Sequence, residues 1–436
     1  MAHPRLPSDC TLLPTGTGQL LVSRSHATFC GLSHEDSRQM ESDEEWPEAL
    51  RSHLETHGFF AEPRNAEPDR PSAQLQLTNA CNLACTYCCT HSGQARGQEL
   101  SRERWFELIP EISQAMGRGT NVAILGGEPL LQPWALDLAS LVLDEGLNLS
   151  LFTNGLPLRD EDLALGTARL MERGAEVRIS LAGPTAASCD GESGIARFEG
   201  ALAAIHALSR HGQRPVMDLM LTPQNSQSVA KALPELRKRL PPGIVIAFGL
   251  LFHGGRERGA HLFQDRATLE ETLDRITFEA GERIDAEQPR PVTFRREGCT
   301  CALGAHLHVR SDGRLFTCFR MEECVGDLTQ EAFRVALARC LDTPRPASCL
   351  PLCAPCPLAT LCGGGCRAEN IQFTGNGDTP ICGPWRVQVI SELLAEDHPS
   401  ALDWPVHMLL AEAHRRGIPA PSELVPAKPS LHLLEV

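Results

Sequence analysis

Cysteine is the residue type in this sequence that could do chemistry, with 18 copies among 436 residues. Cys81, Cys85 and Cys88 have the spacing C-x3-C-x2-C within the segment T-N-A-C-N-L-A-C-T-Y-C-C. Thiolates are the ligands of iron–sulfur clusters, and a four-iron cluster normally takes four of them. Three closely spaced thiolates would leave one iron with an open position, where another molecule can bind. A zinc site or a set of buried thiols is the alternative interpretation.

A second set of cysteines lies between residues 299 and 382. Cys301 and Cys318 fit the spacing C-x11-G-x4-C, with Gly313 as the glycine. A later run has the spacing C-x2-C-x5-C-x3-C-x15-C and consists of Cys353, Cys356, Cys362, Cys366 and Cys382. Zinc in a ribbon-like fold is an alternative use of such ligands. Disulfides are a weaker alternative, because a reducing compartment disfavours them.

The composition restricts the class of protein that these cysteines serve. The chain is 42% hydrophobic and 22% charged, which is the balance of a globular protein. A formal net charge of −15 argues against a nucleic-acid binder, since neutralising phosphates requires surplus positive charge. No apolar run approaches the roughly 18 residues of a membrane span. The first residues, M-A-H-P-R-L-P-S-D-C, lack the apolar core of a signal peptide, so we predict a cytoplasmic protein.

The elements that position the first cysteine motif belong to a repeating strand–helix pattern between residues 74 and 250. Six strands are expected, at Leu75–Thr78, Asn121–Leu125, Leu147–Thr153, Val177–Leu181, Pro215–Thr222 and Ile244–Phe248. Amphipathic helices separate them, the first beginning after a plausible cap at Ser101. Such units predict a parallel sheet with right-handed crossovers, as an open barrel or a doubly wound sheet. The cysteine loop follows the first strand, at the end where barrel enzymes carry their active sites.

The flanking segments have different patterns. The segment G-T-G-Q-L-L-V-S-R predicts a short strand or hairpin arm, and Leu32–Phe60 has helical spacing. The proline-rich stretch from Ala61 predicts a linker. Residues 305–318 predict a hairpin with its turn at S-D-G, and the chain after Trp385 predicts helices.

The first cysteine motif resembles the signature of the radical S-adenosylmethionine superfamily, C-x3-C-x-aromatic-C. Tyr87, the only tyrosine of the chain, stands at the aromatic position. The segment G-G-E-P follows the second strand and resembles the loop that holds the amino group of S-adenosylmethionine; its residues are Gly126, Gly127, Glu128 and Pro129. T-N-G, which contains Asn154, ends the third strand as in the family. Taken without this context, both segments would be ordinary turns.

The end of the fourth strand departs from the family pattern. S-L-A-G-P, beginning at Ser180, resembles S-[IL]-D-G-P, whose serine lies near the ribose and carboxylate of the cofactor, but Ala182 replaces the aspartate. Relatives usually have an arginine about twelve residues after that serine. Glu192 stands there in this chain, and the nearest downstream arginine is Arg197. The resemblance therefore predicts Ser180 as a cofactor contact and Arg197 as a weaker one.

The second set of cysteines resembles the SPASM extension of radical S-adenosylmethionine enzymes, which carries two auxiliary four-iron clusters. By that resemblance Cys301, Cys318 and Cys366 bind the cluster nearer the barrel. Its fourth ligand is Cys299 or, alternatively, Cys324. The outer cluster would be bound by Cys353, Cys356, Cys362 and Cys382.

The resemblance spans about residues 74–385 and implies an α/β fold. We expect a partial (β/α)6 TIM-like barrel, a C-terminal SPASM cluster-binding extension and a small N-terminal α+β domain. The expected parts are an N-terminal domain at 1–70, the barrel at 71–290, the SPASM domain at 291–385 and a helical tail at 386–436.

The family implies that S-adenosylmethionine, bound at the open iron, is cleaved reductively to a 5′-deoxyadenosyl radical. That radical would take a hydrogen atom from a ribosomally made precursor peptide and so install a crosslink or an oxidative modification. An electron donor of the flavodoxin or ferredoxin type would be a partner, without nucleic acid or membrane. Residues 1–70 would grip a leader peptide by strand addition or, equally, form a plain extension packed on the barrel.

Two other functions stay open at this point. A sulfatase-maturating enzyme resembles the same pattern, but in that branch an aspartate follows the cysteine of G-x4-C, and Phe319 follows Cys318 here. A non-catalytic iron–sulfur or zinc protein is the alternative from another class. The three-cysteine motif and the G-G-E-P segment argue against it, because an electron carrier needs saturated clusters. The sequence indicates no catalytic acid or base.

Overall fold

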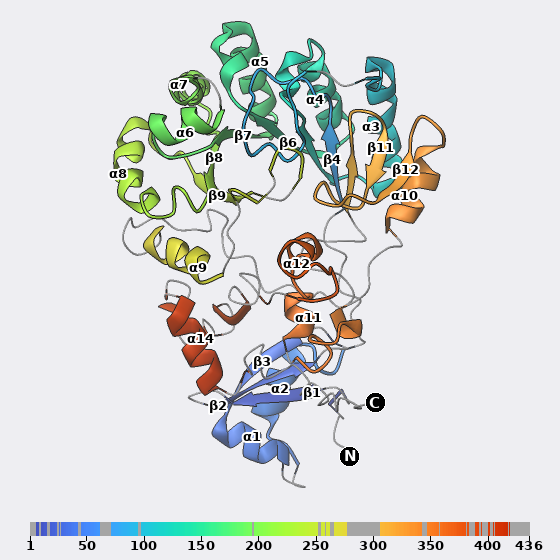
Figure 1. The fold of residues 1–436 in the computed structure, drawn as a ribbon. Coiled ribbons are helices and arrows are strands. Elements are labelled where there is room, and N and C mark those ends of the chain that lie inside the picture. The colour runs from blue at the N-terminus through green and yellow to red at the C-terminus, as the bar shows by residue number, and fades with distance from the viewer. Residues whose placement is uncertain are drawn as a thin grey trace, which may run out of the picture. The chain divides into compact units, whose positions relative to one another are not determined.

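The computed structural model describes most of residues 6–61, 71–276, 306–341 and 347–418, with short gaps inside these ranges (Figure 1). The chain divides into two compact units. One comprises residues 69–289 and 302–343, and the other residues 1–68, 290–301 and 344–436. Several predicted features lie outside the described residues. They are the expected linker after Ala61, the candidate ligands Cys299 and Cys301, and the chain beyond residue 418. Among described residues, no helix has the length and apolarity needed to cross a bilayer.

The first unit is built on a nine-stranded sheet in the order β12-β11-β10-β4-β5-β6-β7-β8-β9. Its six consecutive parallel strands are β4 (Ser72–Gln76), β5 (Asn121–Leu125), β6 (Asn148–Thr153), β7 (Glu176–Leu181), β8 (Val216–Leu221) and β9 (Ile246–Leu250). The strand–helix pattern of the sequence is thereby confirmed as a parallel α/β sheet. The strand expected at Leu75–Thr78 begins earlier, although Leu77 still donates to the carbonyl of Leu125.

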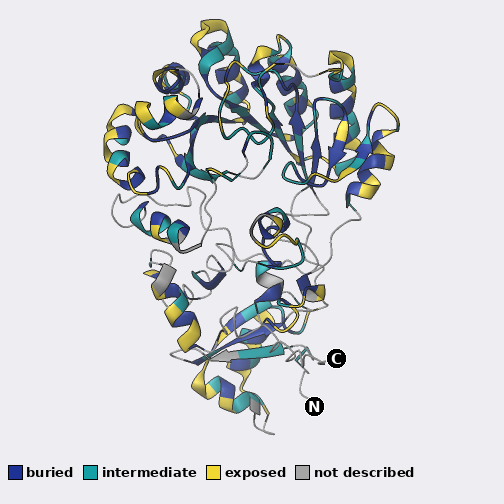
Figure 2. Cartoon of the chain, viewed as in Figure 1, coloured by how far each residue is buried: buried dark blue, intermediate teal, exposed yellow. Residues whose placement is uncertain are grey.

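Helices follow the strands, and those between β4 and β9 cover one face of this sheet (Figure 1). They are α3 (Arg102–Met116), α4 (Ala135–Asp144), α5 (Glu161–Glu172), α6 (Ala186–Ser193), α7 (Phe198–Arg210), α8 (Val229–Arg239) and α9 (Arg266–Asp274). Ser101 caps α3 by accepting from the amide of Arg104 at 3.2 Å, as the sequence predicts. Alternate strand residues such as Leu75, Ile124 and Leu151 are buried in the core shared with the helices, because successive side chains point to opposite faces. Figure 2 shows the buried residues in dark blue along the strands and helices of this unit.

The predicted hairpin joins the same sheet. Strand β10 (His306–Val309) pairs with β4 in parallel. Strand β11 (Arg314–Phe316) pairs with β10 antiparallel, and β12 (Cys324–Asp327) pairs with β11 antiparallel. Helix α10 (Phe333–Leu341) packs on these strands through Phe333, Ala336 and Leu337. The compact unit thus continues through residues 302–343, a part of the chain in which the sequence predicts the cluster-binding extension.

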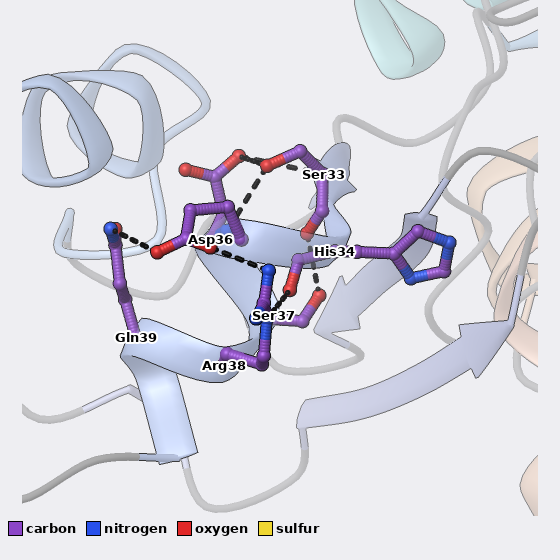
Figure 3. A network of polar contacts seen from close by, with 7 residues as sticks. Ser33, His34, Asp36, Ser37, Arg38 and Gln39 are labelled. Atoms are coloured by element: carbon purple, nitrogen blue, oxygen red, sulfur yellow. Dashed lines mark hydrogen bonds and ion pairs between the residues drawn. The ribbon is translucent and has the colours of Figure 1, made fainter.

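The second unit contains a three-stranded antiparallel sheet in the order β1-β2-β3 and two helices. Its elements are β1 (Cys10–Pro14), β2 (Gly18–Ser23), β3 (Thr28–Ser33), α1 (His34–Glu41) and α2 (Glu48–Thr56). Ser33 and Asp36 exchange hydrogen bonds across the first turn of α1, each side chain accepting from the other residue's amide at 3.0 Å (Figure 3). This reciprocal cap explains why the strand ends and the helix begins there.

The remaining described part of the second unit is short helices and turns. They are a 3-10 turn at Ala347–Cys349, α11 (Ala359–Cys362), α12 (Arg367–Thr374) and α14 (Val406–Arg415). One apolar cluster joins Leu20 and Val22 of β2 to Leu350, Leu358 and side chains of the C-terminal helices. The two ends of the chain therefore share one core within this unit.

Candidate functional site

The loop that carries the first cysteine motif begins where β4 ends and folds back on itself through its own backbone. Gly93 donates to the carbonyl of Asn79 at 3.0 Å, and Cys81 donates to the carbonyl of Gly93 at 2.7 Å. The Cys88 thiol accepts from the amide of Ser92 at 3.2 Å. A loop closed in this way presents its thiols from a fixed backbone, as a cluster site requires.

The three thiols of this loop lie close together. Burial, with the neighbouring Cys85 and Cys88 thiols adding to the effect, raises the pKa of Cys81 to about 11. A four-iron cluster holds each of its thiolates on a different iron, so three neighbouring thiols on one loop are suitable ligands for such a cluster.

The G-G-E-P segment docks against this loop through backbone hydrogen bonds. The amide of Gly127 donates to the carbonyl of Thr78 at 2.8 Å, and the amide of Glu128 donates to that of Ala80 at 2.9 Å. A Cβ atom on Gly127 would lie 2.1 Å from the Ala80 oxygen, and one on Gly126 would lie 2.8 Å from the Thr78 oxygen. The two glycines are thus needed for close approach of two backbones.

The Glu128 carboxylate is buried and ties G-G-E-P to the T-N-G turn. It accepts from the hydroxyl of Thr153 at 2.8 Å, from the amide of Asn154 at 2.7 Å and from the amide of Leu130 at 3.2 Å. Burial raises the pKa of Glu128 to about 7, while these hydrogen bonds oppose the rise. The Asn154 side chain in turn donates to Asn82 of the cysteine loop at 2.7 Å. The three motifs therefore form one connected unit.

At the end of β7, Ser180 meets a buried arginine. The Ser180 hydroxyl donates to the carbonyl of Thr153 at 3.5 Å, and the Arg197 guanidinium donates to the carbonyl of Ser180. Arg197 is 2% exposed, and its Nε has no hydrogen-bond partner. Burial acts to lower the pKa of Arg197, but the nearby Tyr87, Cys189 and Cys85 raise it overall, so the guanidinium lies beside the cysteine loop. An unpartnered buried N–H group here fits an anionic ligand such as the carboxylate of S-adenosylmethionine.

Sequence reasoning missed Arg256, which holds the cysteine loop through hydrogen bonds and is called the Arg256 clamp below. Arg256 donates from its amide to the carbonyl of Cys88 at 2.9 Å, and from its side chain to the carbonyls of Cys85 and Ser92, each at 2.7 Å. The neighbouring Gly255 has a φ of 55°, and a Cβ there would lie 2.4 Å from the Cys88 oxygen. The available signal was the glycine pair G-G-R after the sixth strand, which parallels G-G-E-P after the second.

A buried acid–base pair lies next to this clamp and was also missed. Glu257 is fully buried, and its carboxylate contacts Nδ1 of His261 at 2.7 Å. The His261 ring stands edge-on to that of Tyr87, with 6.1 Å between the ring centres. The pair fixes the loop after β9 against the aromatic residue of the cysteine motif.

The candidate ligands of the inner auxiliary cluster are described only in part. Cys318 is buried, near Cys340, whose thiol donates to the carbonyls of His306 and Phe316. Cys324 is exposed on β12 and donates to the carbonyl of Gly326 at 3.2 Å. Their assignment to the cluster stays a prediction.

Four other predicted ligands gather in the second compact unit. Burial, with the nearby Cys362, Cys356 and Cys382 adding to the effect, raises the pKa of Cys353 to about 12. Burial likewise raises the pKa of Cys362 to about 11. These four are the residues that the SPASM resemblance assigns to the outer cluster, and Cys366, assigned to the inner one, is also buried.

The parallel sheet and the connected cysteine, G-G-E-P and T-N-G loops define a radical S-adenosylmethionine domain. Residues 75–233 match the family model described as the Radical SAM superfamily. The chain therefore contains a radical SAM domain, which implies a four-iron cluster and S-adenosylmethionine.

Curated relatives share this part of the chain. The sporulation killing factor maturation protein SkfB of Bacillus subtilis is 30% identical over 139 residues, covering 29% of this chain and 33% of SkfB. The mycofactocin maturase MftC of Mycobacterium tuberculosis is 31% identical over 137 residues, 31% of this chain and 34% of MftC. The chain thus matches about a third of the length of each. The PqqA peptide cyclase of Xanthomonas oryzae is 24% identical over 339 residues, 72% of this chain and 88% of the cyclase.

Two solved structures share the fold. The structure of anSMEcpe with bound AdoMet has a TM-score of 0.55 at 17% identity, covering 78% of this chain and 99% of that chain. Streptococcus suis SuiB bound to S-adenosylmethionine has a TM-score of 0.53 at 13% identity, covering 86% of this chain and 98% of that chain.

Proposed function

We propose that this chain is a radical S-adenosylmethionine maturase that modifies a ribosomally made peptide. The observation that carries the proposal is the connected set of loops in which Glu128 joins G-G-E-P to T-N-G and Asn154 joins T-N-G to the cysteine loop. The cluster would supply the electron that cleaves S-adenosylmethionine to the 5′-deoxyadenosyl radical, which removes a hydrogen atom from the peptide. Cys81, Cys85 and Cys88 would hold the cluster, and Arg197 and Ser180 would orient the cofactor.

The names of the relatives support a peptide substrate. A maturation protein for a killing factor, a mycofactocin maturase and a PqqA peptide cyclase are among them, and SuiB has been crystallised bound to the precursor peptide SuiA. We propose that two auxiliary clusters lie in the SPASM extension and that a flavodoxin or ferredoxin reduces the chain. The three-stranded sheet β1–β3 would bind the leader of the precursor by strand addition. We also propose that the protein is located in the cytoplasm.

The decisive experiment uses the anaerobically reconstituted, reduced full chain incubated with S-adenosylmethionine. The expected product is 5′-deoxyadenosine at a rate well above that of a Cys85→Ala control. No difference from the control would remove the enzyme hypothesis. A short precursor peptide encoded beside this chain would then be added. Mass spectrometry of the peptide should show a loss of mass that corresponds to removed hydrogen atoms. A formylglycine in a sulfatase peptide instead would favour the sulfatase-maturating alternative.

A further inference from the structure

The N-terminal sheet and its second helix hold a group of ligand-type side chains that the proposed radical chemistry does not use. Cys30 lies on β3, His53 lies in the last turn of α2, and His57 is the residue that ends α2. The sulfur of Cys30 and one ring nitrogen of each histidine all lie within 4.8 Å of one another. Among the described residues, this is the only group of three or more such side chains that meets this distance.

The geometry of the group approaches that of a bound metal ion. Zinc–sulfur and zinc–nitrogen bond lengths place the ligand atoms of a tetrahedral site about 3.3–3.6 Å apart. The two imidazole rings have centres 4.5 Å apart and are tilted by 58°, so they are not stacked face to face. The i, i+4 spacing of His53 and His57 puts both rings on one side of the helix end. Small side-chain rotations would therefore bring the three atoms onto one ion.

Each ring donates one hydrogen bond to a backbone carbonyl, which leaves its other nitrogen available to a metal. Nε2 of His53 lies 2.9 Å from the carbonyl oxygen of Gly31, and Nδ1 of His57 lies 2.8 Å from the carbonyl oxygen of His53. A carbonyl oxygen can only accept, so these nitrogens carry the protons, and Nδ1 of His53 and Nε2 of His57 carry lone pairs. Metal-bound histidines are commonly oriented in this way by a backbone carbonyl.

We propose that Cys30, His53 and His57 form a binding site for a zinc ion, independent of the iron–sulfur clusters. One thiolate and two imidazoles are the ligand set that zinc accepts and that magnesium and calcium do not. Cys30 is 2% exposed within an apolar cluster that includes Leu21 and Leu54, whereas both histidines reach the surface and give the ion a path of entry.

The ion would tie the sheet to the helix. Cys30 belongs to β3, His53 belongs to α2 and His57 caps that helix, so zinc would add a crosslink between two elements that already meet through a small apolar cluster and hydrogen bonds. A ligand that binds only the folded state stabilises it in proportion to the logarithm of its concentration. The proposed role is therefore to fix the N-terminal sheet. This role does not depend on the radical chemistry.

The test measures zinc in the full chain after its iron–sulfur clusters have been reconstituted, so that the cluster cysteines are occupied. One equivalent of zinc is added, excess is removed, and zinc and iron are measured by elemental analysis. The expected result is about one zinc per chain in the parent protein and in a His34→Gln control, whose exposed histidine lies on the neighbouring helix α1. His57→Gln and Cys30→Ala should lose at least ninety per cent of that zinc with unchanged iron.

X-ray absorption at the zinc edge should show one sulfur and two nitrogen neighbours, and iron does not interfere at that edge. Any of three results would overturn the proposal. They are zinc retained in both variants, several sulfur neighbours around zinc in the absorption spectrum, and a parent protein that holds no zinc. Cys30→Ala can fail to fold because the thiol is buried. In that case the zinc content of His57→Gln, a substitution at a surface position, decides whether the proposal holds. Formation of 5′-deoxyadenosine by the same samples separates this result from the proposed function.

Discussion

The side chain of Arg256 donates from Nε to the main-chain carbonyl of Cys85 at 2.7 Å, across 171 positions of sequence. The same guanidinium donates to the carbonyl of Ser92, and the Arg256 amide donates to that of Cys88. The segment after the last barrel strand thus holds the cysteine loop that follows the first. The backbone that presents Cys81, Cys85 and Cys88 is therefore held by a residue that lies outside their own motif.

Replacing Arg256 by leucine should weaken the cluster site. The Cys85 and Ser92 carbonyls would lose a charged donor, and an unpaired buried acceptor costs about 1–3 kcal/mol. We expect lower iron retention on gel filtration and a rate of 5′-deoxyadenosine formation reduced at least about tenfold, the equivalent of roughly 1.4 kcal/mol. Arg210→Leu, on an exposed part of α7, is the matched control. Equal iron and equal rates in the two variants would show that the clamp is dispensable.

Gly127→Ala should disrupt the contact between G-G-E-P and the cysteine loop. The added Cβ would lie 2.1 Å from the Ala80 oxygen, and a backbone atom cannot rotate away as a side chain can. The two loops must separate, so we expect loss of S-adenosylmethionine binding, measured by equilibrium dialysis, together with a lower midpoint of thermal unfolding. Gly191→Ala on α6 is the control, since a Cβ there meets nothing within 4 Å. Normal binding by Gly127→Ala would argue against close docking of these backbones.

Arg197→Gln tests the fit of the buried guanidinium to the cofactor. Glutamine removes the charge and the unpartnered Nε, and it shortens the side chain that donates to Ser180. The expected result is an S-adenosylmethionine Kd raised at least about tenfold, since a charged hydrogen bond contributes about 1.5–3 kcal/mol, with iron content unchanged. A Kd within twofold of the parent value, at full iron content, would assign Arg197 to packing alone.

The sequence predicted the parts of this protein that depend on local pattern. Short apolar runs that alternate with amphipathic helices predicted the six parallel strands, and the cysteine spacing identified the loop after the first of them. It did not predict contacts between distant segments, such as Arg256 with Cys85 or Glu257 with His261, because neither spacing nor periodicity encodes them. Glu128 illustrates the same limit, since its carboxylate contacts Thr153 and Asn154 as well as its own loop.

Two buried histidines on strand β10, His306 and His308, should make the stability of the fold depend on pH. Burial lowers the pKa of His308 to about 3, with Arg310 and His306 adding to the effect, and burial lowers that of His306 to about 4. A histidine whose folded pKa lies below its unfolded value near 6.5 binds its proton more tightly when unfolded. Its stabilising contribution is therefore present above about pH 6.5 and is lost as pH falls toward the folded pKa.

His308→Phe should remove a defined share of this acid sensitivity. Nδ1 of His308 has no hydrogen-bond partner, and the ring lies 6.3 Å from that of Phe316 and 6.2 Å from that of Phe319, so phenylalanine suits the site. Between pH 7 and pH 5 the parent chain should lose about 2 kcal/mol through His308, and the variant should keep it. Urea unfolding at the two pH values measures the difference, with His206→Gln, a surface histidine on α7, as the control. A variant whose free energy of unfolding falls as steeply as that of the parent would mean that His308 is already protonated or solvated in the folded state.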